Sequence, residues 1–357
     1  MTIRLGINGM GRIGRLVLRH ALARSASFET SGAVRKGPAM QVVAANDLAD
    51  AEELAYLLGH DSVHRKNLPR ARAEGGALHV DGQKIALFKE KDPSKIPWAE
   101  HGVDIVIEAT GRFTSREGMA GHRAQEGGPS HVILAAPGKG VDKTLVVGVN
   151  DETFDPEKDR LVSNASCTTN ALTPVLSVLD RVFGVRWGLV GTTHAYTAGQ
   201  GLVDGLAGKD LRRGRAAAQN IVPTSTGAAK AIAEVLPNLR GKCDGTAVRV
   251  PVVDGSLYDV VCVLEGEPPL SKVIEALREA SQTEALRGVL DVRQEALVSS
   301  DILGDPHSSI VDVDACMGMG ALVKIVGWYD NEWGYAGRVL DLAAIAGNWI
   351  AGQRAKA

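Results

Sequence analysis

The sequence of 357 residues lacks the features of a membrane, secreted or nucleic-acid-binding protein. No apolar run approaches the roughly 18 residues of a membrane span, and the first residues show no basic segment followed by an apolar one, as in a secretory signal. The four cysteines are far apart without Cys-x-x-Cys spacing, which argues against a disulfide framework or a zinc cage. With 40 basic and 42 acidic residues, a formal charge of −2 provides no broad basic surface. We therefore expect a cytoplasmic protein without nucleic-acid or membrane partners.

The chain is long enough for two domains, and its first part alternates apolar segments with helical patterns. Hydrophobic residues make up 45% and charged residues 23% of the sequence, as in ordinary globular proteins with a core. Apolar runs separated by helices predict strands buried on both faces of a parallel sheet. An irregular stretch at 26–40 is interpreted as a surface insertion. The expected strands are 3–7, 41–45, 103–109, 131–135 and 144–149, with helices beginning near residue 13 and covering 48–58.

After residue 166 the pattern changes to long strands with fewer helices between them. This change is typical of a mixed or antiparallel sheet covered on one side. We therefore predict an α/β protein with domains at 1–166 and 167–335, and a C-terminal helix (336–357) that packs back on the first domain. In the second domain we expect strands at 187–194, 246–253, 257–264, 309–313 and 321–328, and helices at 168–179, 227–236 and 271–280, with the last helix covering 337–350.

A glycine motif, Gly9-x-Gly11-x-x-Gly14, follows the first strand and opens the first helix. Its glycines permit a tight turn and close approach of the main chain to a pyrophosphate, which the helix N-terminus stabilises. Asp47 ends the next strand, where its carboxylate would accept hydrogen bonds from both ribose hydroxyls and repel the 2′-phosphate of NADP. These features predict a Rossmann-type doubly wound sheet that binds NAD. The alternatives are a glycine-rich turn without ligand and a helix cap at Asp47.

Cys167 lies among small polar residues in S-N-A-S-C-T-T-N (163–170), directly before a predicted helix. Unpaired main-chain N–H groups at a helix N-terminus favour an anion and can lower the pKa of a thiol. A nucleophile needs a base, and His194 ends a strand in G-T-T-H-A-Y-T. We expect a reactive thiol that ionises near neutrality beside this imidazole. The alternative, a buried structural cysteine, fits Cys262 in V-V-C-V-L better.

With these motifs, the sequence closely resembles the phosphorylating glyceraldehyde-3-phosphate dehydrogenases. The resemblance runs in order along essentially the whole chain, and its cysteine and S-T-G-A-A-K-A segments are far more specific than the glycine motif. It implies a Rossmann domain, an α+β catalytic domain with a mixed or antiparallel sheet, and a homotetramer. The segments that carry it are G-I-N-G-M-G-R-I-G-R, A-N-D-L, S-N-A-S-C-T-T-N, K-D-L-R-R-G-R-A-A-A-Q-N-I-V-P-T-S-T-G-A-A-K-A and G-W-Y-D-N-E-W-G-Y.

The resemblance also implies the chemistry. Cys167 would attack the aldehyde of glyceraldehyde 3-phosphate to form a thiohemiacetal, and hydride transfer to the nicotinamide would leave a thioester. Inorganic phosphate would attack this thioester and release 1,3-bisphosphoglycerate. His194 would accept the hydroxyl proton and stabilise the developing oxyanion.

The same resemblance assigns binding residues to two anions and to the cofactor. Arg213 is preferred to Arg212 by alignment of the D-L-R-R run, although on composition alone a solvated basic loop is the favoured explanation of 212–215. The attacking phosphate is assigned Ser166, Thr168, Thr226 and Gly227; the substrate phosphate Thr197, Arg213 and Arg249; and the cofactor Gly9, Gly11, Arg12, Ile13, Gly14, Asp47, Lys91 and Asn331.

The sequence departs from the family pattern at several positions. Gly199 stands where the family usually has Asp or Thr, so one contact to the substrate phosphate is expected to be missing. Ala135 replaces a common serine near the cofactor. The loop 204–209 lacks the proline common in NAD-specific members, which leaves use of NADP open despite Asp47.

The sequence leaves two alternatives to a phosphorylating glyceraldehyde-3-phosphate dehydrogenase open. Erythrose-4-phosphate dehydrogenases share the cysteine segment but not usually the S-T-G-A-A-K-A loop, which is present here. A non-enzymatic binding protein of the same fold has no chemical reason to retain Cys167 and His194 together. His60 and His64 have a spacing that can bind a metal on a helix, but no acidic partner is evident, and we expect no metal site.

Overall fold

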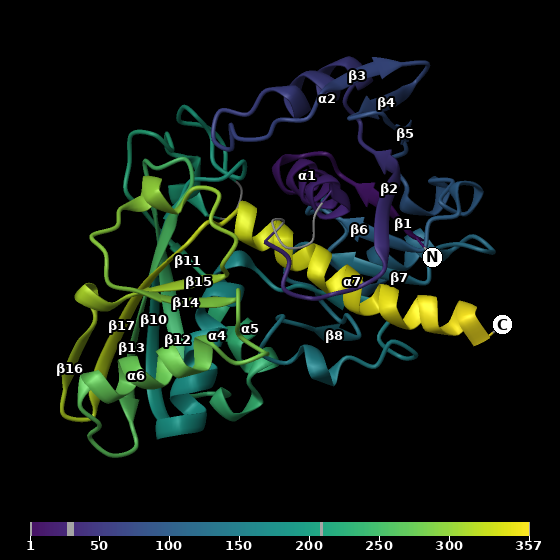
Figure 1. The fold of residues 1–357 in the computed structure, drawn as a ribbon. Coiled ribbons are helices and arrows are strands. Elements are labelled where there is room, and N and C mark those ends of the chain that lie inside the picture. Colours follow the sequence, from purple (N-terminus) through teal and green to yellow (C-terminus); the bar gives the residue numbers. More distant parts are fainter. Residues whose placement is uncertain (1, 27–31, 208–209, 357) are drawn as a thin grey trace. The chain divides into compact units, whose positions relative to one another are not determined.

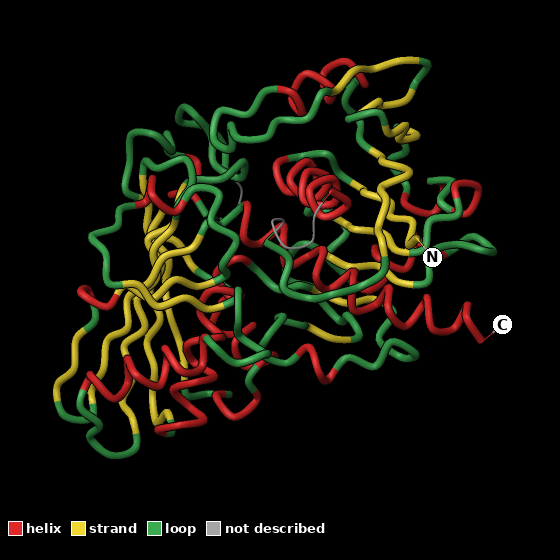
Figure 2. The backbone as a smooth tube through the Cα atoms, viewed as in Figure 1, coloured by secondary structure: helices red, strands yellow, loops and turns green. Residues whose placement is uncertain are grey.

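The computed structural model describes residues 2–26, 32–207 and 210–356, which divide into two compact units (Figure 1). The predicted insertion at 26–40 lies partly outside the described residues. The first unit comprises Met1–Leu145, Asp151–Ala165 and Ala336–Ala357, and the second comprises Val146–Asn150 and Ser166–Tyr335. Each unit contains one sheet with its own helices; Figure 2 draws the helices in red and the strands in yellow.

The sheet of the first unit has the strand order β3-β4-β5-β2-β1-β6-β7-β9-β8. From β5 to β8 all neighbouring strands are parallel, and β2 and β6 flank the central strand β1. This reversal of strand order beside β1 is the switch point at which doubly wound sheets bind ligands. The strands are β1 (Thr2–Asn8), β2 (Ala39–Asn46), β3 (Ala71–Glu74), β4 (Ala77–Val80), β5 (Gln83–Phe88), β6 (Ile105–Glu108), β7 (His131–Leu134), β8 (Lys143–Thr144) and β9 (Leu161–Ser163).

The predicted α/β fold class is confirmed, but one predicted strand of the first sheet is wrong and a group of strands was missed. The run 144–149 is not a strand: only Lys143–Thr144 pairs with β9, and buried turns follow. A short buried apolar run cannot be distinguished from a strand by periodicity alone. The antiparallel hairpins β3–β4–β5 were not predicted from the sequence.

The helices of the first unit are α1 (Arg12–Ala26), α2 (Ala51–Gly59), α3 (Arg116–Ala120) and most of α7 (Trp333–Lys356). Asp341 of α7 accepts hydrogen bonds from the Arg24 side chain of α1 and from the main-chain N–H groups of Val34 and Arg35. Its other oxygen pairs with Arg338, also fully buried. Because a buried carboxylate requires such partners, these contacts tie α7 to α1 and to the segment before β2.

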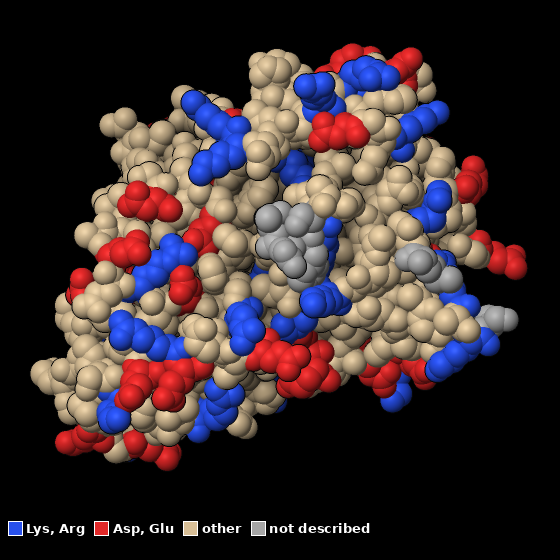
Figure 3. Space-filling model, in the orientation of Figure 1, with Lys and Arg blue, Asp and Glu red and all other residues tan. Residues whose placement is uncertain are grey.

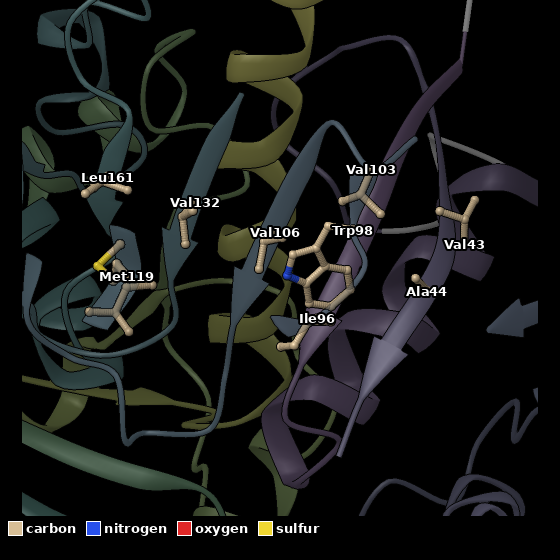
Figure 4. Packing of buried hydrophobic residues seen from close by; sticks show 10 residues of the cluster. Val43, Ala44, Ile96, Trp98, Val103, Val106, Met119, Val132 and Leu161 are labelled. Atoms are coloured by element: carbon tan, nitrogen blue, oxygen red, sulfur yellow. The ribbon is translucent and has the colours of Figure 1, made fainter. Parts of the chain in front are cut away.

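A hydrophobic cluster on one face of this sheet centres on Trp98, which is 1% exposed (Figure 4). A Cβ atom at Gly6 of β1 would lie 2.7 Å from the Trp98 ring, so only glycine lets the indole lie against this strand. The Trp98 Nε1–H donates to His122 Nδ1 at 3.1 Å, which satisfies its polar atom inside the core. The cluster contains Val43, Ala44, Ile96, Trp98, Val103, Val106, Met119, Val132, Leu134 and Leu161.

The sheet of the second unit is mixed, with the order β11-β12-β10-β13-β17-β15-β14 and with β16 paired to β17. β10 pairs with β12 and β14 with β15 in parallel, and the remaining pairs are antiparallel. The strands are β10 (Val185–Ala195), β11 (Val222–Ser225), β12 (Cys243–Val250), β13 (Ser256–Leu264), β14 (Leu290–Arg293), β15 (Ser309–Asp312), β16 (Met317–Met319) and β17 (Leu322–Tyr329).

Three helices cover one face of this second sheet: α4 (Cys167–Phe183), α5 (Ala228–Val235) and α6 (Leu270–Ser281) (Figure 1). Residues of β13 alternate between buried and half-exposed along the strand, as expected for a sheet with one covered face. The predicted mixed sheet covered on one side is confirmed.

None of the described helices combines the length and apolarity needed to cross a bilayer. On the face drawn in Figure 3, basic and acidic side chains are interspersed, without a continuous area of one sign.

Candidate active site

The cysteine segment forms a sharp turn into helix α4 in the second unit. Ala165 has φ of 54°, a left-handed conformation that is uncommon for a residue with a side chain. Ser166 caps the helix by accepting a hydrogen bond from Thr169 N–H at 3.0 Å. The helix therefore starts at Cys167, and this side chain, which remains partly exposed, lies at the N-terminal end of the helix as predicted.

Cys167 lies beside His194, a buried histidine near the end of β10. The Sγ atom of Cys167 is 3.5 Å from Nε2 of His194, which is 4% exposed. On the other side of the ring, Nδ1 lies 2.7 Å from the carbonyl oxygen of Ala195. A proton on Nδ1 that is donated to this carbonyl leaves the Nε2 lone pair facing the sulfur. The structure thus brings together the two residues that the sequence suggested as nucleophile and base.

Arg249 of β12 also lies beside the imidazole of His194. Its Nη1 donates to the Ala195 carbonyl at 2.8 Å and lies 2.5 Å from Nδ1 of His194. Burial and this guanidinium lower the pKa of His194 to about 3. The imidazole is therefore neutral throughout the physiological range.

The expectation of a thiol that ionises near neutrality is wrong for this structure. Burial raises the pKa of Cys167 to about 11, although Arg249 and hydrogen bonds with Thr168 act in the opposite direction. The sequence showed the helix N-terminus but not how much water the surrounding chain excludes, and desolvation disfavours the thiolate. At neutral pH the pair therefore consists of a thiol and a neutral imidazole, with Nε2 of His194 3.5 Å from the sulfur.

Tyr329 of β17 was not predicted as a site residue. Its hydroxyl lies 2.9 Å from Thr168 Oγ1 and 2.9 Å from Thr192 Oγ1, and its ring meets the His194 ring edge-on with centroids 5.9 Å apart. Burial raises the pKa of this phenol, so it remains protonated. Tyr329 therefore joins the first turn of α4 to β10 and keeps the imidazole beside the sulfur. It stands two residues before Asn331 in the family-like segment G-W-Y-D-N, the only sequence signal for it.

The hydroxyls assigned to the attacking phosphate have partners of their own. Ser166 Oγ caps α4 and also lies 2.8 Å from Thr169 Oγ1, and Thr168 is bonded to Tyr329. Thr226 and Gly227 come directly before α5, and Gly227 is its N-cap residue. The N-terminus of a helix offers main-chain N–H groups to an anion.

Two arginines and a threonine assigned to the substrate phosphate occur in the same unit. The Nε atoms of Arg213 and Arg249 are buried and, within the described part of the chain, have no hydrogen-bond partner. The charge of Arg213 contributes to lowering the pKa of Arg249, after burial as the main cause. An anion bound between guanidinium groups would supply the missing acceptors.

Asn331, assigned to the nicotinamide, is buried and held by Ser256. Asn331 Oδ1 accepts a hydrogen bond from Ser256 Oγ at 2.5 Å, and Ser256 Oγ accepts one from the Ala195 main-chain N–H at 3.1 Å. Ser256, which sequence reasoning missed, therefore links Asn331 to the strand that carries His194. With Oδ1 engaged, the Nδ2 atom is the group that Asn331 can present to a carboxamide oxygen.

In the first unit, the glycine motif forms the turn from β1 to α1. Gly9 has φ of 95°, and a Cβ atom there would lie 2.7 Å from Thr110 N. A Cβ atom at Gly14 would lie 1.9 Å from Gly9 O, whereas one at Gly11 would face open space. Gly9 and Gly14 are thus required for the turn and for helix packing, and Gly11 leaves the main chain open to a ligand.

Asp47, at the end of β2, faces this turn. Its Oδ2 accepts from Met10 N–H at 2.7 Å and its Oδ1 from Ala49 N–H at 3.0 Å, so the carboxylate is fixed beside the glycine motif. Arg12, the first residue of α1, pairs with Asp61 at 2.9 Å, Ile13 is half-buried, and Lys91 is exposed. The contacts of these residues with the pyrophosphate, the ribose and the adenine stay predictions.

A buried polar chain that was not predicted supports the same turn. Asn46 Nδ2 donates to Asn8 Oδ1 at 2.8 Å, and Asn8 Nδ2 donates to Glu108 Oε2 at 2.5 Å. The other carboxylate oxygen of Glu108 accepts from Thr110 N–H at 2.8 Å. The ends of β1, β2 and β6 are therefore cross-linked just below the glycine turn, which limits its movement.

Comparison with known proteins agrees with this arrangement in both units. Residues 3–116 match the family model described as glyceraldehyde 3-phosphate dehydrogenase, NAD binding domain, and residues 166–331 match that of the C-terminal domain. The chain is 48% identical to glyceraldehyde-3-phosphate dehydrogenase of Geobacillus stearothermophilus over 345 residues, covering 96% of this chain and 98% of the relative. It is 47% identical to that of Streptomyces coelicolor over 355 residues, covering 98% and 100%. The chain belongs to the glyceraldehyde-3-phosphate dehydrogenase family.

Proposed function

We propose that this protein is an NAD-dependent dehydrogenase that oxidises glyceraldehyde 3-phosphate and conserves the energy as 1,3-bisphosphoglycerate, using inorganic phosphate. The observation that carries the proposal is the placement of Cys167 at the N-terminus of α4, 3.5 Å from the buried imidazole of His194. A partly exposed thiol beside a neutral base is suited to attack an aldehyde. Relatives named for this activity share 46–48% identity over nearly the whole chain.

In this proposal the segment 1–166 binds NAD and the segment 167–335 carries the covalent chemistry. Gly11 and the N-terminus of α1 would lie along the pyrophosphate, with Arg12 and Ile13 beside it, and Lys91 near the adenine. Asp47 would accept hydrogen bonds from the ribose hydroxyls. To do so, it would give up the hydrogen bond that it accepts from Met10 N–H. When bound, NAD supplies the acceptor for a hydride from the substrate.

The chemistry assigned to Cys167 and His194 conserves protons at each step. As the sulfur attacks the aldehyde carbon, His194 Nε2 takes the thiol proton and gives it to the developing oxyanion, which yields a thiohemiacetal. His194 then removes this hydroxyl proton while a hydride leaves the same carbon, and a thioester remains on Cys167. A phosphate oxygen attacks the thioester carbon, the bond to sulfur breaks, and Cys167 recovers a proton from His194.

The anionic groups are assigned to two sets of residues. Thr197, Arg213 and Arg249 would hold the phosphate of the substrate, because the buried guanidinium atoms lack acceptors. Ser166, Thr168, Thr226 and Gly227 would hold the attacking phosphate near the N-termini of α4 and α5.

Turnover is expected to depend on a tetrahedral oxyanion. With inorganic phosphate or arsenate, reduction of NAD by glyceraldehyde 3-phosphate should continue, because either anion cleaves the thioester. Without them it should stop after about one equivalent per site, since water is a poorer nucleophile at this site. The measurement is NADH absorbance in phosphate-free buffer with and without each anion. Equal steady-state rates in all buffers would exclude the phosphorylating reaction, and a preference for erythrose 4-phosphate would favour the alternative dehydrogenase.

We also propose that the protein is a homotetramer. The open face of the second sheet exposes several large apolar side chains, among them Trp187 (61% exposed) and Leu189 (65%) on β10. Exposed apolar groups on neighbouring strands of a sheet favour contact with another subunit. Val261, Val263 and Leu322 line a shallow hollow on the same face.

Substitution of Trp187 by aspartate is expected to reduce the tetramer to smaller species, because a charge would be buried in an apolar interface. Sedimentation velocity measures the change. Tyr56→Asp is the matched control, since Tyr56 is as exposed (62%) but lies on α2 of the first unit. A wild-type protein that sediments as a monomer would contradict the proposed assembly.

The cytoplasm is the compartment that we propose. All four cysteines are free in the structure. The nucleophile must stay reduced to act, which requires a reducing environment.

A further inference from the structure

Two of the cysteines that the chemistry does not use lie on either side of Gly188 in the second sheet. Gly188 of β10 is paired with Cys243 of β12 on one side and with Cys262 of β13 on the other. Residues directly opposite one another in paired strands point to the same face of a sheet. Both thiols are therefore on the face to which a side chain at Gly188 would point, and Cys262 is fully buried there.

The absence of a side chain at Gly188 leaves a space between the two sulfurs. A Cβ atom there would lie 3.1 Å from Sγ of Cys243 and 3.4 Å from Sγ of Cys262, so the two sulfurs are within about 6.5 Å of each other. A metal–sulfur bond is about 2.3 Å for zinc, and an ion that bridges two sulfurs therefore needs them roughly 4 to 5 Å apart. Even at the upper limit, each sulfur would have to move by about 1 Å to reach this separation.

This arrangement excludes a disulfide and does not fit zinc. Because Cys243 and Cys262 are on strands separated by β10, their Cα atoms are about 9 to 10 Å apart, beyond the roughly 7 Å that a disulfide can span. Zinc takes four ligands. Among the described residues, neither thiol belongs to a group of three thiol, imidazole or carboxylate ligands that lie within 4.8 Å of one another. Cu(I), a soft ion for which thiolates are selective, needs only two such ligands.

The charge next to the two thiols also favours a cation. Burial is the main cause that raises the pKa of Cys243, and burial raises the pKa of Cys262 to about 12; the carboxylate of Asp180 on α4 adds to both effects. Asp180 Oδ1 accepts a hydrogen bond from Val185 N–H at 3.1 Å, and among the described residues Asp180 forms no ion pair. A positive ion between the sulfurs would compensate this carboxylate and the thiolates that bind the ion.

We propose that Cys243 and Cys262 form a binding site for a soft monovalent cation, Cu(I), which lies over Gly188 and bridges the two sulfurs. Binding forms two Cu–S bonds and releases both thiol protons to solvent, with no change in the oxidation state of copper or sulfur. Cys243 is partly exposed at the beginning of β12 and provides the entry for the ion. Gly188 is about 20 Å along β10 from His194, so the site is separate from the catalytic pair and does not depend on the proposed function.

The test measures Cu(I) binding to the full-length Cys167→Ser variant, in which the catalytic thiol cannot compete for the ion. Anaerobic titration against bicinchoninate, followed by the absorbance of its Cu(I) complex, should show one tightly bound ion per subunit. Adding Cys243→Ser should weaken binding by at least about 100-fold, because one sulfur cannot bridge the ion. Adding Gly188→Ala should weaken it by at least about 10-fold although both thiols remain, since the methyl group fills the space of the ion.

Cys316→Ser is the matched control in the same background. Cys316 is a buried free thiol of the same unit whose sulfur is hydrogen-bonded to the main chain, so its replacement should leave Cu(I) affinity unchanged. Tryptophan fluorescence on addition of NAD shows whether each variant is folded. If Gly188→Ala does not fold, Cys243→Ser and the proton count below decide the question.

A second measurement counts the protons released on binding. Because burial raises the pKa of both thiols, each is protonated at neutral pH, and one bound Cu(I) should release two protons at pH 7. The absence of a saturable site, release of one proton per ion, or equal affinity in the Cys243, Gly188 and Cys316 variants would overturn the proposal and indicate inert structural thiols. A chain that binds Cu(I) in this way but does not oxidise glyceraldehyde 3-phosphate would contradict the proposed function alone.

Discussion

Replacement of Cys167 by serine is expected to abolish aldehyde oxidation while leaving NAD binding intact. A serine hydroxyl is a much weaker acid than a thiol and a poorer nucleophile toward the aldehyde, so it gives up its proton to the imidazole far less readily. We expect kcat to fall by about four orders of magnitude or more. The NAD dissociation constant, measured by quenching of tryptophan fluorescence, should remain within about twofold of the wild-type value.

Cys243→Ser provides the matched control for this experiment. Cys243 is a free, partly buried thiol at the start of β12, and it has no assigned role in the chemistry. This variant should retain activity and should lose it on alkylation of Cys167, whereas Cys167→Ser should show no alkylation at position 167. Full activity of Cys167→Ser would refute covalent catalysis. Loss of both activity and NAD binding would instead indicate a structural role for the thiol.

The parts of the site that the sequence predicted well are those carried by local patterns. The glycine motif and Asp47 are positioned by the β1–α1 turn and the end of β2, and both lie where parallel strands end beside a switch point. Cys167 was predicted at the start of a helix from small polar residues before an apolar pattern, and the Ser166 cap explains that pattern. In each case a few consecutive residues determine the geometry.

The parts that the sequence could not predict depend on residues far apart in the chain. Tyr329 contacts Thr168 and Thr192 through pairing of β17 with β13 and of β13 with β10, a register that no local pattern specifies. The buried chain Asn46–Asn8–Glu108 likewise exists only because three strands pair in parallel. Long-range pairing of this kind is set by the whole fold and not by propensity.

The sequence did not indicate how strongly burial shifts the pKa values of Cys167 and His194. The helix N-terminus and nearby Arg249 favour a thiolate at Cys167, but burial outweighs them and raises the pKa to about 11. The same burial, together with Arg249, keeps the imidazole of His194 neutral. The reactive state is therefore not a preformed ion pair: in the absence of substrate, the pair is held neutral, and charge develops only as the sulfur attacks.

This difference gives the substitution His194→Asn a distinctive pH dependence. The variant loses the base that takes the thiol proton, so we expect turnover at pH 7 to fall by about 10²- to 10⁴-fold. The residual reaction must use the ionised fraction of Cys167. Because that fraction grows tenfold for each pH unit below the pKa, the residual rate should rise with a slope near one up to about pH 10.

The wild-type protein should behave differently over the same range. Its imidazole, with a pKa of about 3, stays unprotonated at every pH from about 5 upward, so general-base removal of the thiol proton does not require prior ionisation. Alkylation of Cys167 by iodoacetamide, followed by mass spectrometry from pH 6 to 10, measures the difference without substrate. His60→Asn, at an exposed histidine after α2, is the control. A wild-type rate that rises tenfold per pH unit, as expected for His194→Asn, contradicts removal of the thiol proton by the imidazole. A flat profile for His194→Asn contradicts a thiol that stays protonated over this range.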